Sequence, residues 1–288
     1  MDLTPISVIL AVLSLIVGYL QLRKMHSSKK RRKTEIHKVS LLKQILEKKS
    51  ITIACFNYPP FVKYNIETNE EPTGYYPAIF KEIARKNNLE IDWKCISIAD
   101  SVESINNQEA DIILSLFQTP NRSKHVDFCC LHHSVKVGGV SRRSLRGITS
   151  LSDLINSGLK VVVGRNEVGH EIIQGMGIAK NRLIIIDNEE VAKIVSFVET
   201  GHADIAILDS VSIKNFFEKY YKKNGSTLKP IFQKSPLYMC TNGIMIPKDE
   251  QEFEKWIEKE VYILRKTNDI KEIEKDFLEE YSSIINRR

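Results

Sequence analysis

The side chains that can take part in the widest range of chemistry lie close together near the middle of the chain. Between residues 125 and 133 they are His125, Cys129, Cys130, His132 and His133. Histidine and cysteine commonly bind zinc, but adjacent cysteines lack the two-residue spacing with which two thiolates reach one ion. We therefore predict no metal site and no cofactor, with metal binding as the less favoured alternative.

Two other charged residues stand beside predicted elements. Arg122 lies in a polar segment, where it could be a surface arginine. Asp209 follows the apolar run 205–208, where its side chain could cap the next helix. The sequence contains no G-x-x-x-x-G-K phosphate loop, and it shows no recognisable arrangement of a nucleophile with a base.

The elements that must position these residues follow an alternating pattern. From residue 50 onward, short apolar runs alternate with amphipathic helical patterns. Strands are predicted at 51–56, 91–97, 112–116, 160–163, 183–186 and 205–208, and helices at 76–87, 100–106, 169–176, 188–199 and within 250–281. Ser150, with Asp153 three residues later, predicts the start of a further helix. Alternation of this kind is typical of an α/β fold, with parallel sheets and helices on both faces.

One pattern occurs twice. Asn107-Gln-Glu-Ala-Asp-Ile and Gly201-His-Ala-Asp-Ile each follow a predicted helix and lead into a predicted strand. Asn and Gly both adopt the left-handed conformation that ends a helix. The repetition predicts two similar α/β lobes.

Seven short motifs occur in order along the chain. They are Tyr58-Pro-Pro-Phe61, Gly74-Tyr75, Ala110-Asp111, Thr119-Pro-Asn-Arg122 with Val126-Asp-Phe128, residues 148–154, Gly201-His-Ala-Asp204 and Asp209-Ser210. With these motifs, residues 51–281 resemble the family 3 bacterial extracellular solute-binding proteins, whose fold is the two-lobed type II periplasmic-binding-protein fold. The resemblance implies a lobe 1 made of 51–142 and 238–288, a lobe 2 made of 143–237, and a ligand cleft between them.

The resemblance also implies how the cleft would bind a small, amino-acid-like solute that carries a carboxylate. Arg122 occupies the position at which the family binds the α-carboxylate, and Asp209 the position that accepts from the ammonium group. Tyr58 and Phe61 would form an aromatic wall, unless they belong to the core. Such a protein closes around its ligand and is not an enzyme.

The predicted ligand-binding set is completed by residues that partly depart from the family. Ser115 fits the small or hydroxyl residue expected before the Thr-Pro-x-Arg segment, whereas Phe117 replaces a common threonine. On lobe 2, Asn166 and Glu167 replace small residues that contact the carboxylate. A glutamate would repel a bound carboxylate, so either Glu167 points away or the solute carries a cationic group. Cys55 stands where binders of basic amino acids have an acid, which argues against such a solute.

An enzyme of the same fold is the alternative. A few relatives are dehydratases that act on prephenate-like or arogenate-like acids, and the position of their catalytic glutamate corresponds to His170, with Glu171 next to it. A histidine can act as a general acid, but a histidine at the start of a helix more often faces solvent. We therefore predict a protein that is not an enzyme.

The N-terminal segment predicts a membrane anchor. An uncharged stretch of 20 residues begins at Leu3 and ends at Leu22. At about 1.5 Å per residue it spans a hydrocarbon core of roughly 30 Å. Asp2 is the only charged side chain before it, and no small-x-small cleavage pattern follows, so a retained single-pass anchor at 1–22 is predicted rather than a signal peptide. Residues 23–50 are predicted to form a basic juxtamembrane segment and a linker helix at 34–49.

The sequence gives conflicting indications of the side of the membrane on which the lobes lie. The basic cluster from Arg23 to Lys33 slightly favours a cytoplasmic C-terminal domain by the positive-inside rule, and it would also bind anionic lipids. The five irregularly spaced cysteines do not form a disulfide framework, which fits a reducing compartment. Members of the family usually lie outside the cytoplasm. The predicted partner is accordingly either a transporter permease or a signalling protein.

The charge distribution argues against nucleic acid as a partner. Residues 1–50 hold 11 Lys or Arg and 3 Asp or Glu, so the remaining chain holds 31 basic and 33 acidic residues. The net charge of +6 therefore comes from the N-terminal segment. A nucleic-acid surface requires basic residues clustered on the folded domain, and none is predicted.

Overall fold

The computed structural model describes residues 39–65, 70–187, 190–221 and 226–287. The chain divides into two units, Met1–Ser40 and Leu41–Arg288, and the fold below is that of the second unit. The predicted span from Leu3 to Leu22 and the basic cluster from Arg23 to Lys33 lie outside the described residues. Among the helices that are described, none combines the length and the apolar character needed to cross a membrane.

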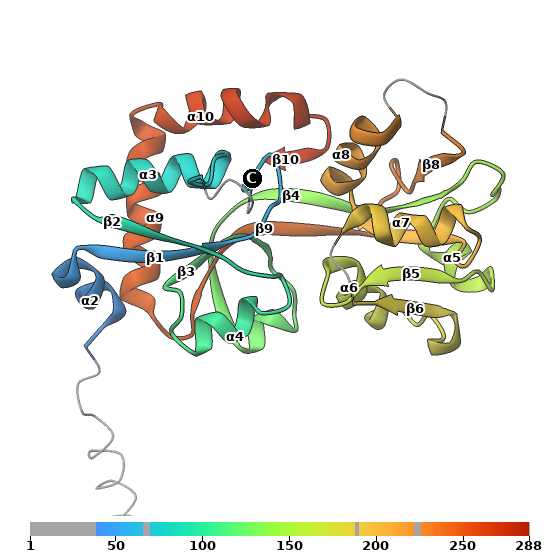
Figure 1. The fold of residues 1–288 in the computed structure, drawn as a ribbon, viewed down its shortest axis with the longest axis horizontal. Coiled ribbons are helices and arrows are strands. Elements are labelled where there is room, and N and C mark those ends of the chain that lie inside the picture. The colour runs from blue at the N-terminus through green and yellow to red at the C-terminus, as the bar shows by residue number, and fades with distance from the viewer. Residues whose placement is uncertain (1–38, 66–69, 188–189, 222–225, 288) are drawn as a thin grey trace, which may run out of the picture. The chain divides into compact units, whose positions relative to one another are not determined.

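Lobe 1 is built on three parallel strands, with β1 between β2 and β3. Their bounds are β1 Ser50–Cys55, β2 Glu90–Cys95 and β3 Ile112–Phe117. The side chains of β3 are all buried, as expected for a central parallel strand covered on both faces, and α3 and α4 lie on opposite sides of these strands (Figure 1). The helices of this lobe are α2 (Leu41–Lys48), α3 (Tyr75–Asn87), α4 (Ser101–Asn106), α9 (Gln251–Lys266) and α10 (Asp269–Leu278).

Lobe 2 repeats this arrangement with β5 between β6 and β7. The strands are β5 Val161–Gly164, β6 Leu183–Ile186 and β7 Ile205–Asp209, and β8 (Leu228–Ile231) pairs with β4 beside them. The helices are α5 (Leu151–Asn156), α6 (Val168–Gly175), α7 (Val191–Glu199) and α8 (Ser210–Tyr221). Two α/β lobes are therefore present, as the repeated sequence pattern predicted.

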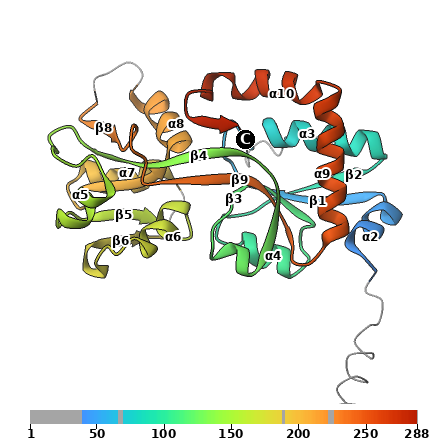
Figure 2. The same cartoon turned by 180° about the vertical axis from the view of Figure 1, so that it is seen from behind.

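Two long antiparallel strands, β4 (Val126–Arg142) and β9 (Tyr238–Pro247), connect the lobes. In lobe 1, β9 pairs with β3, and in lobe 2, β4 pairs with β7 and β8. Figures 1 and 2 show both strands running from one lobe into the other. The C-terminal strand β10 (Ile285–Arg287) pairs with β4. All strands thus belong to one continuous sheet.

Most predicted elements are present, with ends displaced by a few residues. The predicted N-cap is confirmed: the Asp153 amide donates to Ser150 Oγ (3.2 Å) and the Ser150 amide donates to Asp153 Oδ2 (2.9 Å). The predicted linker helix at 34–49 differs, because within the described residues α2 begins at Leu41. Ile45 of α2 is buried in the core of lobe 1. This helix is therefore part of the lobe.

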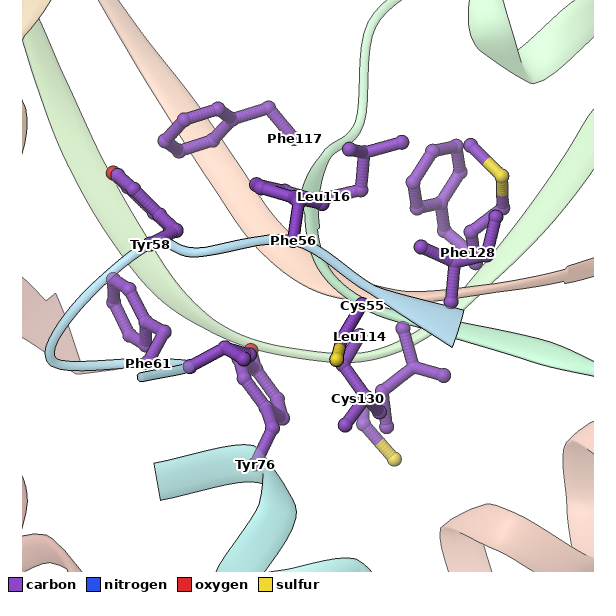
Figure 3. Packing of buried hydrophobic residues seen from close by; sticks show 14 of the residues in the cluster. Cys55, Phe56, Tyr58, Phe61, Tyr76, Leu114, Leu116, Phe117, Phe128 and Cys130 are labelled. Atoms are coloured by element: carbon purple, nitrogen blue, oxygen red, sulfur yellow. The ribbon is translucent and has the colours of Figure 1, made fainter. Parts of the chain in front are cut away.

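An aromatic cluster fills lobe 1 beside the loop that follows β1. Tyr58 stacks on Phe61 with ring centroids 5.5 Å apart and meets the edge of Phe117 at 5.8 Å. Phe61 also packs against Tyr76 of α3 at 5.8 Å. Figure 3 shows Tyr58 and Phe61 on the loop, Phe117 near Tyr58, and Tyr76 reaching toward the loop from its helix. The cluster holds the loop, and with it Tyr58, in one position.

Candidate functional site

A small cavity of about 80 Å³ lies between the two lobes. Its polar lining residues come from both of them: Asn57, Tyr58, Ser115 and Arg122 from lobe 1, and Glu167, Asp209 and Ser212 from lobe 2. Six of the eight residues predicted to bind a ligand line this cavity: Tyr58, Ser115, Phe117, Arg122, Glu167 and Asp209. The structure therefore brings together most of the predicted set from distant parts of the sequence.

Arg122 begins a short 3₁₀ turn, Arg122–Lys124, and its backbone amide donates to the hydroxyl of Thr119. Its guanidinium is buried and makes three contacts within the chain. Nη1 donates to the Phe117 carbonyl (2.9 Å), Nη2 donates to the Asn166 carbonyl (2.7 Å), and Nε lies 3.2 Å from a carboxylate oxygen of Glu171. Because Asn166 and Glu171 belong to lobe 2, Arg122 connects the lobes.

Glu171 lies on α6 and is the residue that sequence reasoning missed as a partner of Arg122. One carboxylate oxygen pairs with Arg122, and the other accepts a hydrogen bond from the hydroxyl of Thr119. Burial lowers the pKa of the Arg122 guanidinium, and the charges of Glu171 and Glu167 oppose this shift. Arg122 is therefore a buried cation whose charge is compensated by the chain's own carboxylates.

Asp209 is the last residue of β7 and immediately precedes α8. Its Oδ1 accepts the amides of Val211 and Ser212, both at 2.9 Å, so Asp209 caps this helix as one of the two sequence interpretations expected. The same oxygen accepts the hydroxyl of Tyr58 at 2.7 Å. Burial, together with the charge of Asp209, raises the pKa of Tyr58 well above its usual value, so the phenol stays protonated and donates.

The predicted aromatic wall is only partly realised. Tyr58 and Phe117 line the cavity, together with Phe56. Phe61 is fully buried behind Tyr58 and does not line the cavity. Phe61 thus packs in the core of lobe 1, which was the alternative interpretation of its position.

Ser115 and Asn166 occupy strained or special backbone positions at the edge of the site. Both have positive φ angles, 62° and 60°, which is uncommon for residues other than glycine. Ser115 Oγ lies 3.3 Å from the side chain of Asn242 on β9. Asn166 turns its carbonyl toward Arg122, and its amide donates to Nδ1 of His170 (3.1 Å). Asn166 therefore contacts the site through its backbone and does not line the cavity.

His170, the candidate general acid of the dehydratase alternative, is not the solvent-facing histidine that the sequence predicted. It is buried on α6 and lies outside the cavity lining. Nδ1 accepts from the Asn166 amide, and Nε2 lies 2.7 Å from Gln174. Burial and the charge of Arg165 lower the pKa of His170, so the neutral form is favoured. Its observed role is to hold the loop that carries Asn166.

Among the residues that the structure describes, no group of three or more His, Cys, Asp or Glu side chains could hold a metal ion. Cys129 and Cys130 lie at an irregularity in the pairing of β4 with β9, and Cys130 has a φ of 52°. His133 is buried between the rings of Tyr75 (4.8 Å) and Phe61 (5.7 Å).

A wider groove of about 840 Å³ opens beside the cavity. The two share six lining residues, Phe56, Asn57, Tyr58, Ile98, Val191 and Ser212. The cavity is therefore the inner end of a larger depression between the lobes, and a solute would enter through the groove.

Comparisons with known proteins agree with this architecture. Residues 51–280 match the profile of the bacterial extracellular solute-binding proteins, family 3. A curated relative, the amino-acid-binding protein AabA of Dichelobacter nodosus, is 25% identical over 183 residues, which cover 62% of this chain and 69% of the relative.

Solved structures show the same fold. The cysteine-binding protein of Campylobacter jejuni aligns with a TM-score of 0.69 at 18% identity and covers 87% of this chain and 100% of that one. A histidine kinase sensor domain with similarity to periplasmic binding proteins aligns with a TM-score of 0.68 at 19% identity, covering 80% and 96%. With the family profile matched over most of its length, the chain belongs to the family 3 bacterial extracellular solute-binding proteins.

Proposed function

We propose that this protein closes its two lobes around a small amino-acid-like solute that carries an ammonium group and a carboxylate. The observation that carries the proposal is that Arg122 of lobe 1 and Asp209 of lobe 2 line the same cavity. A cation and an anion on facing walls complement the two ends of a zwitterion. The named relatives that bind amino acids support this choice of solute class.

Each of the two groups has capacity left for a solute. A guanidinium carries five N–H donors, and three of its contacts lie within the chain. The three hydrogen bonds to Asp209 from other described residues all go to Oδ1, so Oδ2 is the oxygen proposed to accept from an ammonium group. Tyr58 and Phe117 would cover the solute from lobe 1.

A thermal-shift screen of the purified full-length chain tests this function. The panel contains the common L-amino acids, their decarboxylated amines and small carboxylates. A ligand at about one hundred times its dissociation constant stabilises the folded state by roughly 2.7 kcal/mol. We expect a shift with at least one amino acid that is lost in Asp209→Asn and kept in Arg85→Ala, which removes an exposed arginine of lobe 1. If no amino acid shifts the transition, the proposed solute class is wrong.

We also propose that residues 1–22 anchor the protein in a membrane as a single-pass segment, and that closure is detected by a permease or by a signalling partner. The uncharged stretch from Leu3 to Leu22 supports the anchor. Of the five cysteines, Cys95 is the exposed one, so it can report the side on which the lobes lie. Labelling of Cys95 by a membrane-impermeant maleimide in intact cells, absent in Cys95→Ser, would place the lobes outside. Labelling only after lysis would place them in the cytoplasm, which the basic cluster favours.

We propose finally that the protein is not an enzyme, because the candidate acid His170 hydrogen-bonds to Asn166 and lies outside the cavity lining. Incubation with prephenate or arogenate should leave both compounds unchanged. Their consumption by wild type, but not by His170→Gln, would support the dehydratase instead.

A further inference from the structure

The contacts that hold the two lobes together at Arg122 use a carboxylate that belongs to the chain itself. Glu171 of α6 pairs with Nε of Arg122, and it also accepts the hydroxyl of Thr119 from the same turn of lobe 1. A carboxylate that forms an ion pair with a guanidinium and accepts a hydroxyl stands where a carboxylate-bearing solute would make the same contacts. The side chains of Arg122 and Glu171 are 5% and 12% exposed, so the pair is largely removed from water.

The fold places Glu171 against lobe 1 by a close contact between α6 and β7. A Cβ atom on Gly169 would lie 2.6 Å from the carbonyl oxygen of Ile207, so glycine allows the first turn of α6 to approach this strand. His170 then receives the Asn166 amide, which fixes the loop before the helix. The Asn166 carbonyl and the Glu171 carboxylate consequently meet Arg122 together.

Three further hydrogen bonds between described residues also cross from one lobe to the other. Tyr58 donates to Asp209. Asn215 of α8 donates to the carbonyl of Pro59 at 2.7 Å and accepts the hydroxyl of Tyr281 at 2.7 Å. Each of these hydrogen bonds joins a residue of one lobe to a residue of the other.

The charges around the cavity also disfavour the binding of a solute carboxylate. Arg122 faces Glu171 and Glu167, and Asp209 lies on the cavity wall. One cation and three carboxylates leave an excess of two negative charges. The positive charge of Arg122 is partly compensated, so a solute carboxylate gains less from it than from an unpaired guanidinium, whereas an ammonium group remains attracted.

We propose that Glu171 is a specificity-determining residue of the cleft: its carboxylate pairs with Arg122 and accepts the hydroxyl of Thr119, closes the lobes without a solute, and weakens the binding of solute carboxylates. This inference deepens the proposed function and rests on it for the selectivity, but the closure can be tested without any solute. Removing the charge of Glu171 takes the nearest carboxylate from the buried Arg122 and leaves its charge less well compensated. Opening of the cleft returns Arg122 to water, so the variant should open.

Closure is measured as a distance between the lobes of the full-length chain by double electron–electron resonance. One spin label is placed on the native Cys95 of lobe 1, the exposed cysteine among five, and the second on Lys193→Cys, an exposed position on α7. Without a solute, we expect one short distance in the wild-type background and a longer distance in Glu171→Gln. Glu199→Gln is the matched control, because Glu199 accepts from Tyr221 within lobe 2, and it should keep the short distance.

Thr119→Val tests the same contact from lobe 1 and should also lengthen the distance. The proposal is overturned if Glu171→Gln and Thr119→Val both keep the short distance. It is also overturned if the spin-labelled protein with Glu171 and Thr119 unchanged already gives the long distance without a solute. Should Glu171→Gln fail to fold, the Thr119→Val result decides by itself.

Selectivity is measured by titrating unlabelled protein with L-cysteine and cysteamine under reducing conditions, since these differ by the carboxylate and suit a cavity of about 80 Å³. Glu171→Gln should raise the affinity for L-cysteine relative to cysteamine by about tenfold, the value of one charge-assisted hydrogen bond. An equal change for both compounds would overturn the selectivity. Binding of neither compound, with the distance change intact, would count against the proposed solute class and leave the closure by Glu171 standing.

Discussion

The hydroxyl of Tyr58 and Oδ1 of Asp209 are joined by a hydrogen bond of 2.7 Å that crosses from lobe 1 to lobe 2. The same oxygen caps α8 through the amides of Val211 and Ser212. A single carboxylate therefore starts a helix, lines the cavity and contacts the opposite lobe. These three roles can be separated by substitution.

Replacing Tyr58 by phenylalanine removes the contact between the lobes and leaves the cap intact. Hydrogen bonds to charged groups stabilise proteins by about 1.5–3 kcal/mol, and we expect a loss of this size in the free energy of unfolding, measured by urea denaturation. Tyr221→Phe is the control, since its hydroxyl bonds to Glu199 on the exposed surface of lobe 2, and it should cost less than about 1 kcal/mol. Equal losses in the two variants would contradict a special role for Tyr58.

Substitutions of Asp209 distinguish the cap from the charge. Asparagine also caps helices well, whereas alanine at an N-cap costs about 0.5–2 kcal/mol. We expect Asp209→Asn to retain most of the stability and to lose affinity for amine-bearing solutes, and Asp209→Ala to lose both. Denaturation and calorimetric titration of the two variants separate the effects. If Asp209→Asn bound amino acids as well as wild type, the ammonium contact would be wrong.

His170 predicts a dependence of stability on pH. Burial and Arg165 lower its pKa in the folded state, so the folded state favours the neutral ring, whose Nδ1 accepts the Asn166 amide. Its contribution is complete above the unfolded pKa of about 6.5 and is lost as pH falls below that value toward the folded pKa. Between about pH 7 and pH 5, wild type should lose more stability than His170→Gln. His202→Gln, at an exposed histidine, should follow wild type.

Substitutions of Phe61 test whether this residue belongs to the hydrophobic core or to the wall of the cavity. It is fully buried behind Tyr58, and truncation of a core phenylalanine to alanine costs about 3–5 kcal/mol. We expect Phe61→Ala to lower the free energy of unfolding by this amount, and Phe61→Leu by clearly less. In Phe61→Leu, solute affinity should change little. A large loss of affinity with unchanged stability would instead place Phe61 in the ligand wall.

The cysteines should differ sharply in reactivity. Burial raises the pKa of Cys55 and of Cys240 to about 12, so both stay protonated and unreactive. Cys95 is exposed, while Cys129 and Cys130 are buried. A thiol reagent should therefore modify one cysteine per native chain and all five after unfolding, and mass spectrometry should locate the first at Cys95.

Much of the fold could be predicted because local patterns agree with it. The alternation of apolar runs and amphipathic segments identified both lobes, and Ser150 with Asp153 marked a helix start that the structure confirms. The long strand β4 was less visible. Its stretch with Cys129 and Cys130 was identified as a strand through the family resemblance, since the irregular pairing there interrupts the alternation that identifies strands.

The sequence could predict only those site residues whose own side chain and position indicate a binding role. Arg122 and Asp209 were predicted because they occupy the positions at which the resembled family binds its solute, and both line the cavity. Glu171 does not stand out, because its partners lie on the other lobe and no local spacing relates residue 171 to residue 122. Asn166 contributes a backbone carbonyl, which the identity of its side chain does not reveal.

The path of the chain through β4 and β9 has a consequence for how the protein could be divided. Residues 143–237 leave lobe 1 at the end of β4 and return at the start of β9, so the two halves of lobe 1 are separated in sequence by all of lobe 2. A protease that cut a loop of lobe 2 would leave lobe 1 as two fragments held by the pairing of these strands. The smaller lobe could be exchanged for another as a cassette, whereas the larger one cannot be produced from a single continuous stretch of the gene.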